Sequence, residues 1–72
     1  MIPVDLNLFK KETGLSIEVD EDYYDEEYGN NRFKVTSDMS LMEVGTRLDT
    51  FNQKYCRKIV PNVIGNEIFI YL

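Results

Sequence analysis

One stretch of the chain concentrates the side chains that could do chemistry. Residues 20–31 read DEDYYDEEYGNN and hold six carboxylates and three tyrosines in twelve positions. Carboxylates attract and pair with basic side chains, and tyrosines supply rigid contact area at a low cost in entropy. We interpret the stretch as a surface that binds a basic region of another protein. Such a region could be a groove in which that protein normally holds nucleic acid. The candidate contact residues are Asp22, Tyr23, Tyr24, Asp25, Glu26, Glu27 and Tyr28.

Two other interpretations of the same stretch concern its carboxylates. In the first it is a solvated hairpin loop, whose charges aid solubility and whose tyrosines pack back on the edge of a sheet. In the second it holds calcium. An EF-hand loop needs alternating acids followed by a glycine and a distal glutamate. Here tyrosines replace the third ligand and the glycine, so only loose cation binding stays open, and we expect no metal and no cofactor.

The residues for catalysis are sparse. The chain has no histidine, which is the commonest general base at neutral pH, and its one cysteine is Cys56. Arg57 and Lys58 follow that cysteine and could lower its pKa, but a nucleophilic thiol would lack its usual imidazole partner. A lone cysteine at a helix-to-strand junction is more often a small core residue. We therefore expect a protein without enzymatic activity.

The charge is distributed unevenly along the chain. Thirteen acids and eight bases give a net charge of −5, and the six acids of residues 20–31 account for all of the excess. An acidic chain is not drawn to the phosphate backbone, which disfavours nucleic acid as a partner. The contrasting hypothesis is a weak nucleic-acid binder that uses a small basic patch of Arg47, Lys54, Arg57 and Lys58.

Export and membrane insertion have no support in the sequence. No apolar run approaches the roughly 20 residues that span a bilayer, and the first residues, MIPVDLNLFKKETG, have neither a basic start nor an apolar signal core. A single cysteine forms no internal disulfide. As written, the chain is expected in the cytoplasm and away from membranes.

The pattern of the first half predicts a short helix and two strands. Asp5 is a candidate N-cap and Gly14 a candidate C-terminal cap around a helix of about two turns. LSIEVD then alternates, with Leu15, Ile17 and Val19 expected inside, and RFKVT alternates likewise. The two strands would form an antiparallel hairpin, with the acidic tyrosine stretch as its connection.

The second half predicts a long helix and a closing hairpin. Ser40 and Glu43 form a capping box, and an apolar face recurs at helical spacing along the residues that follow. CRKIVPNVIGNEIFIYL predicts two strands around a Gly-Asn turn, with Pro61 at an edge or a bulge. The apolar face of the helix comprises Leu41, Val44, Leu48, Phe51 and Tyr55.

The last strand is the second candidate surface, because EIFIYL is apolar on both sides. Phe69 and Tyr71 are expected to face outward if Ile68 and Ile70 face the core. An edge strand of this kind could pair with a partner or form a homodimer. In the alternative, the strand is central and both of its faces are covered within the domain.

Together these elements predict one domain over residues 1–72 with the order αββαββ, an α+β fold of two helices on a mainly antiparallel sheet. From TGLSIEVD, RFKVT, MSLMEVGTRLDTF and GNEIFIYL, residues 9–72 resemble the short N-terminal domain of secretins and TonB-dependent receptors, and the related C-terminal domain of FecR-like regulators. The resemblance implies a periplasmic adaptor that binds other proteins, excised from a larger protein. The missing first strand, the acidic insertion and the start at Met1 depart from that pattern, which leaves open a small phage-type inhibitor or nucleic-acid mimic.

Overall fold

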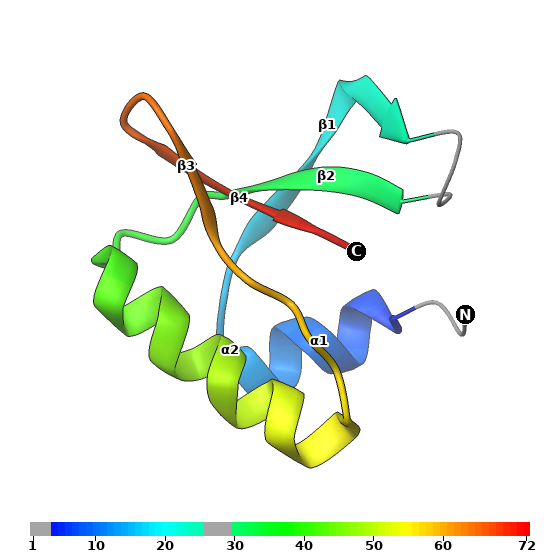
Figure 1. The fold of residues 1–72 in the computed structure, drawn as a ribbon, viewed down its shortest axis with the longest axis vertical. Coiled ribbons are helices and arrows are strands. Elements are labelled where there is room, and N and C mark those ends of the chain that lie inside the picture. The colour runs from blue at the N-terminus through cyan, green and yellow to red at the C-terminus, as the bar shows by residue number, and fades with distance from the viewer. Residues whose placement is uncertain (1–3, 26–29) are drawn as a thin grey trace.

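Two helices cover one face of a four-stranded antiparallel sheet in the computed structural model, which describes residues 4–25 and 30–72 (Figure 1). The strands lie in the order β1-β2-β4-β3, so β1 and β3 are the edges. This confirms the predicted α+β class and the order αββαββ. In chain order the elements are α1 (Leu6–Thr13), β1 (Ile17–Asp25), β2 (Asn30–Val35), α2 (Leu41–Tyr55), β3 (Asn62–Ile64) and β4 (Glu67–Tyr71).

The first helix begins and ends where its capping residues predict. The carboxylate of Asp5 accepts hydrogen bonds from the backbone N–H groups of Asn7 and Leu8, which have no carbonyl partner within the helix. At the other end Gly14 adopts a left-handed conformation with φ of 70°, and its N–H donates to the carbonyl of Lys10. Phe9 is the main apolar side chain that α1 buries.

The second helix begins at a serine cap, as predicted, although only one half of the capping box forms. The hydroxyl of Ser40 accepts from the N–H of Glu43, whereas the Glu43 carboxylate accepts from Arg47. The guanidinium of Arg47 also donates to the carbonyl of Thr13, at 2.7 Å, and so joins the two helices. The expected apolar face is wrong at one position, because Leu41 is 47% exposed and the buried face begins one turn later at Val44.

The core lies between the helices and the inner face of the sheet, which we define as the face toward α1 and α2. Phe9 meets Phe51 edge to face with ring centroids 5.1 Å apart, so the two helices share one aromatic contact. The strands add Ile17, Phe33, Val35 and Ile70 to the same cluster. The remaining members of the core are Leu15, Val44, Leu48 and Ile59.

The acidic tyrosine stretch is mostly strand rather than a connection. Residues 20–25 belong to β1 and residues 30–31 to β2. Val19 pairs with Phe33 and Tyr24 with Asn31, so residues 20–23 lie opposite the single residue Arg32 in a large β-bulge. The expectation of one long hairpin loop is therefore wrong for these residues. Val19, expected inside, is 48% exposed at this edge strand.

The closing hairpin forms around Gly65, with φ of 63°, and Asn66. Pro61 directly precedes β3, an edge strand, as its missing N–H requires. β4 lies between β2 and β3, so it is not the free edge that the homodimer hypothesis needs. The alternative of a central strand is correct along Glu67–Phe69, where β3 pairs through Asn62–Ile64. It is wrong in expecting both faces of the strand to be covered, because both helices lie on the same face of the sheet (Figure 1).

The junction after α2 corrects the expectation for Cys56. Its side chain is exposed rather than in the core, and its backbone caps the helix in the left-handed region with φ of 55°. The side chain of Asn52 holds this junction. Its amide donates to the carbonyl of Ile59 at 2.8 Å and accepts from the Ile59 N–H at 3.0 Å, which brings the chain back toward the sheet.

Candidate functional site

The two helices leave one face of the sheet uncovered, and we call it the outer face (Figure 1). Because side chains alternate along a strand, the neighbours of the buried inner residues must point to this face. Arg32 and Lys34 flank the buried Phe33, and they pair across the ladder with Tyr71 and Phe69. The outer face carries Glu18, Arg32, Lys34, Glu67, Phe69 and Tyr71, and contacts with these residues place Asp20, Asp22 and Tyr23 there as well.

An arginine clamp organises one end of the outer face. The guanidinium of Arg32 donates to one oxygen of Asp20 through both Nε, at 2.8 Å, and Nη2. It also lies 4.7 Å from the ring centroids of both Tyr23 and Phe69, within the range of a cation–π contact. Tyr23 in turn meets Tyr71 edge to face at 5.5 Å. Asp20 and Tyr23, both in the bulge of β1, therefore contact the guanidinium of Arg32.

The same clamp explains the bulge. Asp20 uses one carboxylate oxygen for Arg32 and the other to accept from the backbone N–H of Asp22 at 3.2 Å, which turns the strand locally. The hydrogen bond from Arg32 holds the pKa of Asp20 below its usual value, against the opposing effect of desolvation. Asp20 therefore stays ionised at neutral pH and keeps the clamp closed.

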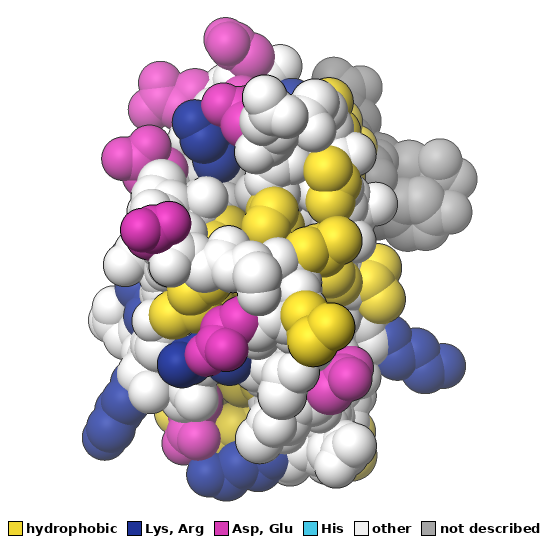
Figure 2. Space-filling view, turned by 90° about the vertical axis from the view of Figure 1, so that its left-hand side faces the viewer, with side chains coloured by type: hydrophobic (Ala, Val, Ile, Leu, Met, Phe, Trp, Pro, Cys, Tyr) yellow, Lys and Arg dark blue, Asp and Glu magenta, His cyan; other side chains and the backbone are white. Residues whose placement is uncertain are grey.

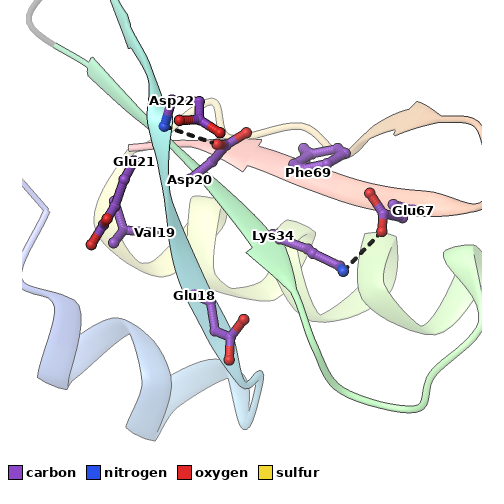
Figure 3. A pocket seen from close by; sticks show the side chains of 8 residues that line it. All are labelled: Glu18, Val19, Asp20, Glu21, Asp22, Lys34, Glu67 and Phe69. Carbon is purple, nitrogen blue, oxygen red and sulfur yellow. Dashed lines mark hydrogen bonds and ion pairs between the residues drawn. The ribbon is translucent and has the colours of Figure 1, made fainter.

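Next to the clamp lies an open pocket of about 410 Å³ (Figure 3). Phe69 is only 6% exposed even though no helix covers it, because the charged side chains around it shield the ring. Lys34 reaches across to Glu67, with 2.8 Å between Nζ and Oε1. Figure 3 shows Val19 and Glu21 pointing to the opposite side of β1 from Lys34. The pocket is lined by Glu18, Val19, Asp20, Glu21, Asp22, Lys34, Glu67 and Phe69.

Acidic side chains dominate the pocket. Five of its eight lining residues are acids and one is a lysine. On the outer face Asp20 and Glu67 are in ion pairs, whereas Glu18 and Asp22 form no ion pair with another residue in the described part of the chain. Figure 2 shows several acidic side chains at the sheet end of the molecule, while Lys and Arg gather mainly around the helices. The outer face thus has unbalanced negative charge that a basic partner could neutralise.

The structure unites the two surfaces that the sequence suggested separately. Asp22 and Tyr23 from the acidic tyrosine stretch lie on β1, and Tyr23 packs against Tyr71 of β4. Phe69 faces outward as expected, although it is only 6% exposed, and its role in contact stays a prediction. Tyr24 and Asp25 also lie in β1. Glu26, Glu27 and Tyr28 are outside the described residues, so their predicted role stays a prediction.

Sequence reasoning missed several residues of this site. Glu18, Arg32, Lys34 and Glu67 were not candidates, although the first three occupy polar positions of alternating strands. That alternation was the signal that could have found them, since polar positions on paired strands share a face. The alternation does not show that β2 pairs with β4, which is what brings Lys34 beside Glu67.

The basic patch of the contrasting hypothesis is partly neutralised. The guanidinium of Arg47 contacts Glu43, and the ammonium of Lys54 lies 3.1 Å from Glu12. The hydroxyl of Tyr55 also donates to Glu12, at 3.0 Å. Arg47 and Lys54 are therefore both paired with carboxylates of the helical layer.

The described residues bring together no group of three or more acids and cysteines that could hold a metal ion. Within residues 4–25 and 30–72, no helix has the length and apolar character needed to cross a bilayer. No protein-family model matches this chain, and no curated protein or solved structure matches it either. Function is therefore inferred from the outer face itself.

Proposed function

We propose that this chain is a non-enzymatic protein-interaction module whose outer face binds a basic surface of another protein. The observation that carries the proposal is the acidic pocket on an uncovered sheet face, held in shape by the clamp of Arg32, Asp20 and two aromatic rings. A preorganised face loses little conformational entropy on binding. Carboxylates without an internal partner steer and pair with basic residues.

The absence of histidine from the sequence, which leaves the exposed thiol of Cys56 without an imidazole partner, supports a role without catalysis. The resemblance to the short domains of secretins, TonB-dependent receptors and FecR-like regulators supports the same class of function, because those domains are adaptors. In that setting the chain would act in the periplasm as part of a larger protein. In the other setting it would act in the cytoplasm as a phage-type inhibitor or nucleic-acid mimic.

The test is affinity capture with two variants that lose the same charge. One variant carries Glu18→Gln and Asp22→Asn in the pocket, and the control carries Asp38→Asn and Asp49→Asn outside it. We expect the wild type and the control to retain the same protein, and the pocket variant to lose it. Circular dichroism establishes that all three are folded.

Ionic strength provides a second measurement on the captured complex. Interactions between exposed charges are screened at high salt, so we expect retention to weaken between about 0.05 M and about 0.5 M salt. Two results contradict the proposed site. In one, both variants retain the partner equally; in the other, the wild type captures no protein. Retention of nucleic acid in place of protein would favour the basic patch instead.

A further inference from the structure

The pocket on the outer face already contains a cation from its own chain. Lys34 is the one basic residue among the eight that line it. Its ammonium donates to Glu67 at 2.8 Å, and its cross-strand neighbour on β1 is Glu18. Figure 3 shows the lysine extending toward Glu67 beside Phe69. The side chain lies where a partner's basic residue would have to go.

The contact that holds Lys34 is an exchangeable one. The Lys34 and Glu67 side chains are 42% and 49% exposed, and ion pairs at such exposure contribute little net stability. By contrast, the Arg32 clamp uses two donors, a carboxylate and two aromatic rings. The outer face therefore combines one fixed cation with one that can leave without unfolding the sheet.

We propose that Lys34 is an internal competitor for the pocket, and that an arginine of a basic partner segment displaces it and pairs with Glu67 and Glu18. This inference rests on the proposed function and names the partner group at the same site. Charge complementarity selects a cation, because acids outnumber bases on the side of the sheet that holds Lys34: these are Glu18, Asp20, Asp22 and Glu67 against Arg32 and Lys34. Arginine is favoured over lysine because its planar fork can bind a carboxylate with two hydrogen bonds.

The hydrogen bond to Glu67 raises the pKa of Lys34, and the negative charge of Glu18 adds to that rise. Lys34 is thus charged at any pH near neutrality. Competition between it and a partner's arginine is therefore an exchange of one cation for another.

The experiment is a titration of the pocket with a short cationic peptide, acetyl-Gly-Arg-Gly-Arg-Gly-amide, followed by amide chemical shifts in the nuclear magnetic resonance spectrum. Lys34→Gln removes the competitor, and Lys10→Gln on α1 removes the same charge away from the pocket. We expect Lys34→Gln to bind the peptide about threefold to fivefold more tightly than Lys10→Gln does. The amides that shift should include those of Glu18, Glu67 and Phe69.

A second variant should move affinity the other way. Lys34→Arg offers Glu67 a two-donor fork, so the internal cation is held more firmly and the peptide should bind more weakly than to the wild type. A peptide with citrulline in place of arginine, which has the same shape without the charge, should not bind to any variant.

Three results would overturn the inference. They are equal affinity gains in Lys34→Gln and Lys10→Gln, tighter binding to Lys34→Arg, or shifts that map away from the pocket. If the pocket variant still loses its captured protein while the lysine variants behave alike, the proposed function stands and the competitor role falls. If the peptide results hold but no protein is captured, the pocket binds cations as inferred and the proposed function fails.

Discussion

At the scale of single residues, Arg32 does the most to define this protein's surface. It lies at the centre of β2, opposite four residues of β1, and contacts a carboxylate and two rings. Without it, Asp20 would lose its ion pair and Tyr23 its cation–π contact. The clamp also makes the site depend on pH, since Asp20 must be ionised to hold the guanidinium.

We predict that Asp20→Asn reduces the dependence of stability on acid pH. The pKa of Asp20 is lowered in the folded protein by Arg32, so its contribution is present above the unfolded value of 3.8 and disappears as the pH falls through the folded value. Urea unfolding from about pH 5 to about pH 2 should show the variant losing less stability than the wild type. Asp49→Asn is the control, and a variant curve parallel to the wild type would contradict the role of the clamp.

At the scale of elements, the junction between α2 and β3 depends on one side chain. Asn52 makes two side-chain hydrogen bonds to the backbone of Ile59, seven residues further on. These bonds take the place of the backbone hydrogen bonds that a regular turn would form. Ile59 is buried in the core, so the junction also fixes an apolar contact. Asn52 therefore couples the end of the helix to the start of the closing hairpin.

We predict that Asn52→Ala lowers the free energy of unfolding by about 1 to 3 kcal/mol, because it leaves a partly buried N–H and C=O without partners. The neighbouring Gln53→Ala, on an exposed position, should change it by less than about 0.5 kcal/mol. Chemical denaturation of both variants measures the difference. Equal effects would mean that water replaces the amide at no cost.

The sequence predicted elements well where their signals are local. The caps at Asp5, Gly14 and Ser40 lie within a few residues of the groups they satisfy, so both helices could be placed from the pattern. The bulge could not, because it depends on Arg32, twelve residues from Asp20. The site was only half predicted for the same reason. Tyr23 and Asp22 were candidates from composition, whereas Lys34 and Glu67 become neighbours only through the pairing of β2 with β4.

At the scale of the whole molecule, the two faces of the sheet are stabilised differently. The inner face buries aliphatic and aromatic side chains against both helices, and Ile70 there is fully buried. The outer face buries the ring of Phe69 beneath charged side chains, so fewer of the described apolar side chains are buried there than on the inner face. The inner face should therefore carry the fold, which would leave the outer face for the binding role that we propose.

We predict that Ile70→Ala costs about 2 to 5 kcal/mol, which is the usual range for truncating a buried isoleucine. A chain of 72 residues has a total stability of only about 4 to 11 kcal/mol, so this one change should lower the melting temperature sharply. Val60→Ala, at an exposed position, should leave it nearly unchanged. Thermal unfolding followed by circular dichroism separates the two, and a mild effect of Ile70→Ala would show that the core does not depend on it.

The strand order has a consequence for how the chain reaches this structure. β1 with β2, and β3 with β4, are hairpins between sequence neighbours, so each closes a short loop at a small entropic cost. Joining β2 to β4 closes a much longer loop that contains α2. The entropic cost of that closure is offset only once the paired residues, from Arg32–Tyr71 to Lys34–Phe69, have formed their contacts. Because the pocket needs β1, β2 and β4 in register, we predict that it forms late in folding, after the two hairpins.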